Sequence, residues 1–279
     1  MTYLLLLVMV TAVWGATFVL VKDAISHYPT LPFLSLRFVL AALVLLVALR
    51  RLPDRRTALV GLPIGAALAA GYLFQTVGLQ YTSPGNAGLL TGLFVVFTPI
   101  LDGAFGAAVP IRTWLAAVAA LAGTFMLTGV GFRLPGLGDL LVIGCAVAFA
   151  GHIVLLGRFA PGAPPAPLAL VQMTVAAAGF TLAAAPGGVR LPPVDVWWAL
   201  AITGVLASAL GFLIQTWAQR HMSASRTALV LATEPAWALA AAIILAGQRF
   251  GVLEAAGAAV ILVAIVGHEA VALRNQSRA

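Results

Sequence analysis

Glu234 is the residue of this chain whose type and position most strongly suggest chemistry. It follows about nine residues of a long apolar segment, so a helix rising ~1.5 Å per residue would carry it to the middle of a membrane. A charged side chain at that depth costs at least about 2.5 kcal/mol on insertion scales. Glu234 could bind a substrate ammonium group or exchange a proton; alternatively, it is a protonated acid that ties neighbouring helices together.

Aromatic side chains accompany this acid. Pro235 follows it and removes a helix hydrogen bond, which suits a bend that lines a cavity. Trp237 comes three residues after Glu234, so we expect the ring and the acid to share a face. Trp14 and Phe94 also fall near mid-depth. Such rings beside one carboxylate would suit an aromatic or amphipathic zwitterion, although simple core packing explains them equally well.

Two glutamines and a histidine are further polar candidates within apolar segments. Tyr72 precedes Gln75 by three residues, just as Phe212 precedes Gln215, so each ring shares a helix face with its amide. The glutamines could form two polar ends of one cavity, or each could bond a neighbouring helix. His152 could relay protons, but it could equally be a satisfied donor between helices.

Arg37 and several helix-bending residues complete the candidates. Arg37 could attract a substrate carboxylate, but its place near the end of its segment favours snorkelling to the headgroups or a carbonyl contact. Gly71 and Gly211 lie near mid-depth and would let helices approach closely. We assign these two glycines, together with Pro99 and Pro235, to hinges or packing.

The composition predicts where these residues lie. The 279 residues are 62% hydrophobic and only 8% charged, whereas a soluble domain carries about 25% charged residues. This excludes a soluble fold, and the hydrophobicity excludes disorder. The net charge of +7 comes from scattered residues, which argues against nucleic-acid binding. The single cysteine, Cys145, excludes an intramolecular disulfide and argues against a cysteine metal site. An integral membrane protein remains.

We expect an all-α membrane protein of ten transmembrane helices. The amino-terminal apolar run lacks a positive leading region and reaches Val21, so it reads as a membrane helix rather than a signal peptide. The cavity should be built from the first, third, fourth, sixth, eighth and ninth helices. The ten expected helices are 3–21, 32–49, 58–80, 84–105, 111–130, 138–156, 166–185, 195–218, 225–246 and 251–270.

The basic residues predict the orientation. If the amino terminus is cytoplasmic, ten loop residues lie on that side: Arg50, Arg51, Arg55, Arg56, Arg112, Arg158, Arg220, Arg226, Arg274 and Arg278. Four lie on the other side: Lys22, Arg133, Arg190 and Arg249. The excess favours cytoplasmic termini at both ends.

The chain also repeats itself. A shift of 140 residues places 72–76 over 212–216 and Gly71 over Gly211, and a shift of about 135 places Trp14 over Phe149. Residues 1–132 and 136–272 would then hold five helices each, followed by a cytoplasmic tail at 273–279. Because five is odd, the halves must insert with opposite orientation. Inverted repeats are typical of transporters that work by alternating access.

Several short motifs in this order resemble one family. They are Trp14-Gly15 with Phe18 and Lys22, Arg37-Phe38, the run 81–87, the run 223–226, Glu234-Pro235 and the run 247–249. The chain resembles an EamA-type drug/metabolite transporter, and within that superfamily it is most similar to bacterial amino-acid exporters, including aromatic ones. The resemblance implies ten helices in two repeats, a small-molecule substrate, no cofactor and the bacterial inner membrane.

The chain departs from the family pattern at acidic positions. Phe94-Val95 stands at the first-half position that matches Glu234-Pro235, and a proline follows one turn later at Pro99. The family often has Gly-Glu-Arg before its fifth and tenth helices. The corresponding residues of this chain, 107–109 and 247–249, include no acidic residue. Any ion-coupling scheme that needs those acids is weakened.

Other function classes lack a signature. The sequence has no HExxH, Walker A or GxSxG motif, and its four histidines are scattered, so we expect neither ATP hydrolysis nor another enzyme activity. A carrier of drugs or other metabolites is the close alternative. An all-apolar cavity would favour drugs, whereas a cavity with both an acid and an anion-binding group would favour amino acids. The choice between monomer and homodimer stays open.

Overall fold

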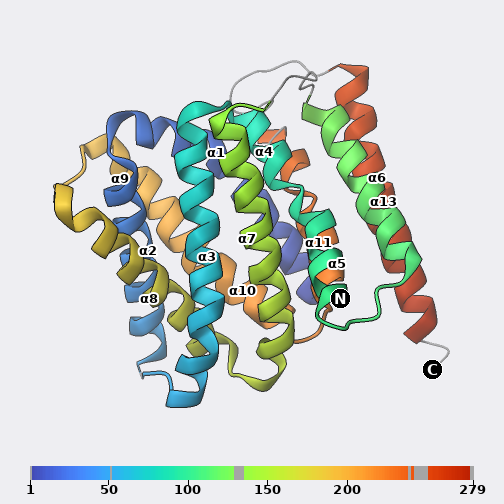
Figure 1. The fold of residues 1–279 in the computed structure, drawn as a ribbon, viewed down its shortest axis with the longest axis horizontal. Helices are drawn as coiled ribbons and strands as arrows, with labels where there is room; N and C mark the ends of the chain where they lie inside the picture. Colours follow the sequence, from blue (N-terminus) through green and yellow to red (C-terminus); the bar gives the residue numbers. More distant parts are fainter. Residues whose placement is uncertain (1, 51, 129–134, 238–239, 242–250, 277–279) are drawn as a thin grey trace.

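Helices make up the structured parts of the chain in a computed structural model that describes residues 2–50, 52–128, 135–237, 240–241 and 251–276 (Figure 1). Seven helical stretches within these residues are long and apolar enough to cross a membrane, and two shorter apolar helices accompany them. The main helices are α1 (Thr2–His27), α2 (Thr30–Leu49), α3 (Arg55–Tyr81), α4 (Pro84–Thr91), α5 (Phe94–Ala104), α6 (Ile111–Thr128), α7 (Leu137–Phe159), α8 (Pro165–Ala184), α9 (Val194–Ala201), α10 (Gly211–Ala218), α11 (Ala224–Leu231) and α13 (Val252–Gln276).

The helices differ from the expected segments in two places. The expected helix 84–105 is divided into α4 and α5, and the expected helix 195–218 is divided by a π-helical segment, η3 (Ile202–Leu210), between α9 and α10. The expected helix 225–246 falls partly outside the described residues, as does the run 247–249. The number of ten membrane helices therefore stays a prediction.

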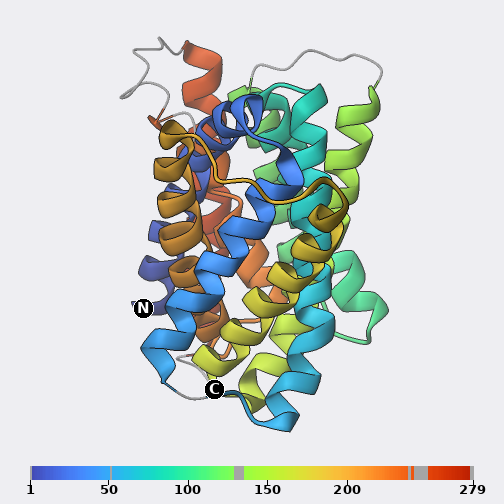
Figure 2. The ribbon, with the colours of Figure 1, turned by 90° about the vertical axis from the view of Figure 1, so that its left-hand side faces the viewer.

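Helix pairs hold the two halves of the chain together. α2 packs along α8, α3 along α7, and α6 along α13 (Figures 1 and 2). Each of these pairs joins a helix from before residue 129 to one from after residue 136, so neither half buries its helices alone. At the α6–α13 contact, a Cβ on Gly123 would lie 2.7 Å from the carbonyl oxygen of Gly257, which shows how closely these two backbones approach.

Polar caps fix where the helices near the cavity begin and end. The Ser83 and Ser223 hydroxyls accept hydrogen bonds from the backbone N–H groups of Asn86 and Arg226, at 3.2 and 3.3 Å, and so start α4 and α11 at positions 140 apart. The Lys22 ammonium of α1 donates to the carbonyl of Leu79 at 2.5 Å near the end of α3. A cation at a helix carboxyl end is stabilised by the helix dipole.

α3 has a side-chain cap of its own. The Asp54 carboxylate accepts a hydrogen bond from the backbone N–H of Thr57 at 2.7 Å. Hydrogen bonds from Thr57 hold the pKa of Asp54 below its usual 3.8, because they favour the charged form.

Two membrane helices tighten at matching places. Between α4 and α5 the N–H of Leu93 bonds the carbonyl of Leu90 at 3.2 Å, a spacing of three residues instead of four. At the end of α11 the N–H of Thr233 bonds the carbonyl of Val230 at 3.1 Å in the same way. These two bonds lie 140 residues apart, and Phe94 and Glu234 directly follow the turns that they close. Interrupted helices at corresponding positions of two halves are a pointer to a transporter's binding site.

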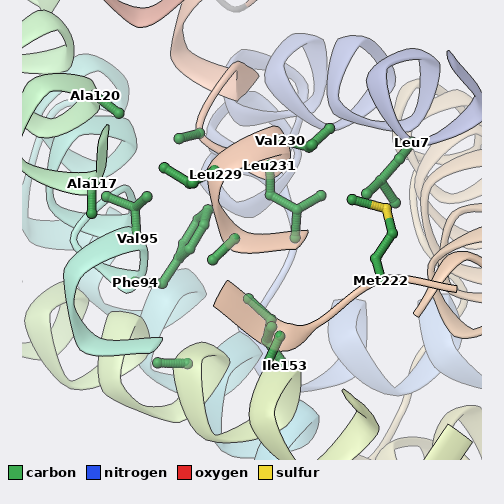
Figure 3. Packing of buried hydrophobic residues seen from close by; sticks show 14 of the residues in the cluster. Leu7, Phe94, Val95, Ala117, Ala120, Ile153, Met222, Leu229, Val230 and Leu231 are labelled. Atoms are coloured by element: carbon green, nitrogen blue, oxygen red, sulfur yellow. The ribbon is translucent and has the colours of Figure 1, made fainter. Parts of the chain in front are cut away.

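A buried apolar cluster packs the two interrupted helices against each other. Figure 3 shows Phe94 and Val95 of α5 beside Leu229 and Leu231 of α11, with Leu7 of α1 in the same cluster. All five side chains are almost fully buried. The cluster therefore fixes the position of Phe94, one of its members, and of α11, which Glu234 closely follows.

Candidate functional site

A cavity of about 640 Å³, counting the part open to solvent, lies between the helices of the two halves. Side chains of α1, α2, α3, α5, α7, α10 and α11 line it, and none of the described residues of α6 or α13 does. Its polar lining residues are Thr17, Arg37, Gln75, Thr76, His152, Gln215 and Glu234, and its aromatic ones are Trp14, Phe18, Tyr72, Phe94, Phe149 and Phe212.

Aromatic rings form a continuous wall of this cavity. Tyr72 meets Phe149 and Phe212 edge to face, at centroid distances of 5.3 and 6.0 Å. Trp14 lies 5.1 Å from Phe212 and donates its indole N–H to the carbonyl of Ala207 in η3 at 2.7 Å. These separations are in the range of favourable ring pairs. The wall thus offers flat apolar surfaces whose orientation is set by neighbouring helices.

Two predicted hinge glycines make room for that wall. A Cβ on Gly71 would lie 2.3 Å from Cε1 of Phe149, and one on Gly211 would lie 2.9 Å from Nε1 of Trp14. Contacts under 3.0 Å force a neighbour to move. The glycines are therefore needed to seat the rings. Pro99 and Pro235 are buried within the helices that follow the two tightened turns.

Arg37 lies inside the protein. Its side chain is only 2% exposed; it donates from Nε to the Ser208 hydroxyl at 2.9 Å and from Nη2 to the Tyr72 hydroxyl at 3.1 Å. The expectation that Arg37 snorkels to the headgroups is wrong, because α2 turns this face towards α8 and η3. Nη1 has no hydrogen-bond partner among the described residues, and Arg37 lines the cavity.

Glu234 reaches the same cavity. The residue is 8% exposed, and its carboxylate has no hydrogen bond or ion pair with any residue that the structure describes. The Tyr72 hydroxyl lies close enough to interact electrostatically with both Arg37 and Glu234. The cavity thus combines one guanidinium and one carboxyl group in a low-dielectric setting, where such groups interact strongly with a ligand.

His152 belongs to a hydrogen-bonded chain between helices. Its Nε2 lies 2.8 Å from Oε1 of Gln172, and Nε2 of Gln172 donates to the hydroxyl of Thr216 at 3.1 Å and to the carbonyl of Leu168 at 3.2 Å. The ring also meets Phe212 edge to face at 5.7 Å. The chain orients the imidazole at the cavity wall.

The two glutamines differ in how they are held. Gln75 donates to the Thr91 hydroxyl at 3.3 Å. Gln215 donates to Oε1 of Gln219 at 3.0 Å, and Gln219 donates to the carbonyl of Ile153 at 2.8 Å. The other Gln215 atom, Oε1, is buried without a partner among the described residues. Both glutamines line the cavity; Gln75 also bonds a neighbouring helix, whereas Gln215 bonds a residue one turn along its own helix.

Trp237 lies apart from the other candidates. It is 39% exposed and does not line the cavity, unlike Trp14, Tyr72, Phe94 and Glu234. Side chains three residues apart in a helix still differ by about 60° around its axis, so one can face the cavity while the other faces outward. The shared face expected for acid and ring is thus not observed.

Sequence reasoning missed Phe149 as a lining residue and favoured a position outside the cavity for Arg37. The repeat carried a signal for Phe149, because the shift of about 135 residues places it over Trp14, another lining residue. Arg37 gave a weaker signal, since a charge near a segment end can equally face lipid or protein.

Comparisons with known proteins agree with this architecture. The model of the EamA-like transporter family matches residues 1–129 and 136–268. The chain is 29% identical over 267 residues to an uncharacterized transporter of Archaeoglobus fulgidus, covering 93% of this chain and 83% of the relative. It is 28% identical over 240 residues to the uncharacterized transporter YyaM of Bacillus subtilis, covering 77% of this chain and 76% of the relative.

A solved crystal structure of a protein shares the fold, with a TM-score of 0.80 over 96% of this chain and 97% of that chain, at 18% identity. Two family matches that together span nearly the whole chain, and apolar helices long enough to cross a membrane, assign the class of protein. The chain is a multi-pass membrane protein that belongs to the EamA-like transporter family, within the drug/metabolite transporter superfamily.

Proposed function

We propose that the protein is a secondary transporter that exports amino acids, aromatic and other neutral ones among them, by alternating access around the cavity. One observation carries this proposal: Arg37 and Glu234 line the same cavity, together with a wall of aromatic rings. A free amino acid has a carboxylate for the guanidinium, an ammonium for the carboxylate, and a side chain for the rings.

Each group has a defined task in this scheme. Nη1 of Arg37 would hold the substrate carboxylate, while Ser208 and Tyr72 keep the guanidinium in place. Glu234 would take the ammonium group or exchange a proton. Trp14, Tyr72 and Phe94 would contact the side chain, and Gln75, His152 and Gln215 would supply the remaining polar contacts. Trp237 would act only if it turns inward in another state.

A carrier of drugs or other metabolites from the same superfamily is the alternative. Bulky apolar drugs would leave the buried Arg37 without an anionic partner, and unpaired buried charges are costly. A membrane-embedded enzyme is the alternative from another class, and membership of a transporter family argues against it.

The transport cycle we propose uses two inverted five-helix halves, 1–132 and 136–272, in a ten-helix bundle. The serine caps at Ser83 and Ser223 and the two tightened turns, each pair 140 residues apart, support such a repeat. Rocking of the halves would open the cavity to either side in turn. We place the protein in the bacterial inner membrane with both termini cytoplasmic, from the distribution of basic loop residues.

Counterflow tests the proposal. Purified protein in liposomes preloaded with unlabelled L-phenylalanine should accumulate external radiolabelled L-phenylalanine, whereas liposomes without protein should not. Unlabelled L-amino acids should compete, and D-phenylalanine and cationic drugs should compete poorly. If drugs or other metabolites drive exchange and L-phenylalanine does not, the amino-acid assignment is wrong although the family and the cavity remain.

A further inference from the structure

The Gln215 amide has an orientation that its neighbours determine. A backbone carbonyl can only accept hydrogen bonds, so the Ile153 carbonyl at 2.8 Å must receive the amide N–H of Gln219. Oε1 of Gln219 therefore points at Gln215 and accepts from its amide nitrogen at 3.0 Å. One N–H of the Gln215 amide is thus committed to Gln219, and its Oε1 stays buried without a donor among the described residues. Since Gln215 is 1% exposed and lines the cavity, this oxygen is an unsatisfied acceptor in the cavity lining.

His152 is oriented by the same logic. The Leu168 carbonyl can only accept, so Nε2 of Gln172 is its donor at 3.2 Å, and Oε1 of Gln172 faces the imidazole. Nε2 of His152 must then carry the hydrogen at 2.8 Å from that oxygen. In the neutral ring, Nδ1 is left as an acceptor, and no hydrogen bond to it is present among the described residues.

Two independent amide chains, each anchored on a backbone carbonyl, therefore present acceptors to the same cavity. Gln215 offers Oε1, His152 offers Nδ1, and Glu234 adds a carboxyl group that has no donor within the described chain. Arg37 supplies donors, but they are partly committed to Ser208 and Tyr72. The free hydrogen-bond acceptors of these three residues are complementary to a ligand that carries N–H donors.

We propose that Gln215 and His152, together with Glu234, select a substrate cation by its N–H donors, so that a primary ammonium group is accepted and a quaternary ammonium group of the same charge is rejected. This inference rests on the proposed function, because it assigns the amino-group end of the same cavity. Gln215 and His152 are specificity-determining residues. Gln219 and Gln172 are positioning residues that keep the acceptors facing the ligand.

The chemistry explains why charge alone does not suffice. A primary ammonium has three N–H donors, whereas a trimethylammonium has none and would bury the acceptors unpaired. Sites built to hydrogen-bond a substrate reject analogues that lack the group far more strongly than apolar sites reject a missing methylene. A difference of about tenfold to a hundredfold in affinity follows from one or two lost hydrogen bonds to a charged group.

The test compares two cations with the same ring and the same charge. Binding of phenethylamine and of N,N,N-trimethylphenethylammonium to the purified full-length protein is measured by calorimetry. The wild type should bind phenethylamine at least about tenfold more tightly. Equal affinities in the wild type would overturn the inference without any variant.

Variants separate hydrogen bonding from size. Gln215→Met keeps a side chain of similar length but removes the acceptor, so the affinity ratio should fall towards one. Gln219→Met should lower the affinity ratio too, because the Gln215 amide can then rotate and move its oxygen away from the ligand. A purely structural role of Gln219 would not change this ratio. The matched control is Gln80→Met, the same replacement at an amide that bonds Thr30 outside the cavity. A ratio unchanged in Gln215→Met would mean that the trimethyl group is excluded by size, which refutes the inference.

The inference and the proposed function fail in different ways. If phenylalanine shows no counterflow but the amine ratio holds, the amino-acid assignment falls and the acceptor site stands. If phenylalanine is transported and its N-trimethyl betaine competes equally well, the function stands and the inference falls. If neither phenethylamine nor phenylalanine binds, both are overturned.

Discussion

Replacing Gly71 by alanine tests whether the aromatic wall depends on a missing side chain. The added Cβ would lie 2.3 Å from Cε1 and 2.4 Å from Cδ1 of Phe149, against 3.4 Å or more for an ordinary contact. The ring must therefore move by about 1 Å, and it is the part of the wall that meets Tyr72 at 5.3 Å. The open space available to it is the cavity itself.

Two opposing effects set the size of the change in stability. Alanine is favoured over glycine within a helix by about 1 kcal/mol, while overpacking typically costs about 1–3 kcal/mol. The net loss is then about 0–2 kcal/mol. A disturbed edge-to-face pair is worth about 0.5–1.5 kcal/mol, so substrate affinity at the wall should fall by up to about tenfold.

Thermal unfolding and phenylalanine counterflow read out the two effects. Gly71→Ala should transport poorly without a large fall in melting temperature. Gly151→Ala is the matched control, since a Cβ there meets nothing within 4 Å and the variant should be as active as the wild type. Adding Phe149→Leu to Gly71→Ala should restore part of the transport. Wild-type transport in Gly71→Ala, with a melting temperature raised as in Gly151→Ala, would refute the close approach.

Three further predictions concern charged residues. In Glu234→Gln, exchange of substrate should survive while pH-driven accumulation fails if the carboxyl group couples protons; persistence of both in liposomes would assign Glu234 to packing. Arg37→Gln should abolish L-phenylalanine counterflow but leave phenethylamine binding within a few fold, because only the first ligand has a carboxylate, and equal losses for both ligands would contradict that role. Asp54→Ala should lower the melting temperature at neutral pH by removing the cap on α3. Because the pKa of Asp54 is held below its usual 3.8, the carboxylate stabilises the fold fully above that value and loses its effect as the pH falls through the lower, folded-state value. The gap between variant and wild type in melting curves from pH 7 to 3 should therefore close only at the acidic end, and a gap independent of pH would count against the cap.

The sequence could predict residues of the cavity and its supports where an ionisable side chain interrupts an apolar segment, or where a residue recurs in both halves of the chain. Glu234 interrupts an apolar segment at high cost, and Gly71 and Gly211 recur at the same shift that relates Ser83 to Ser223. Glu234 is visible without coordinates because a membrane penalises an ionisable side chain, and the glycines are visible because they recur at that shift.

Orientation about the helix axis could not be predicted in the same way. Arg37 points inward because Ser208 of the π-helical segment and Tyr72 receive it, and both lie far away in sequence. Trp237 is partly exposed and does not line the cavity, although it follows Glu234 by only three residues. Which end of the Gln215 amide faces Gln219 depends on the bond that Gln219 donates to a backbone carbonyl of another helix. These are tertiary facts, which helical spacing alone does not contain.

The close pairing of α6 with α13 has a consequence for biosynthesis. A ribosome delivers α6 (Ile111–Thr128) to the membrane long before α13 (Val252–Gln276). Until then the surface around Gly123, which later lies against Gly257, meets only lipid or another chain. A truncation that removes α13 would leave that surface permanently bare. A nonsense mutation between Glu234 and α13 should therefore yield a chain that membrane quality control recognises, although every lining residue of the cavity has been made.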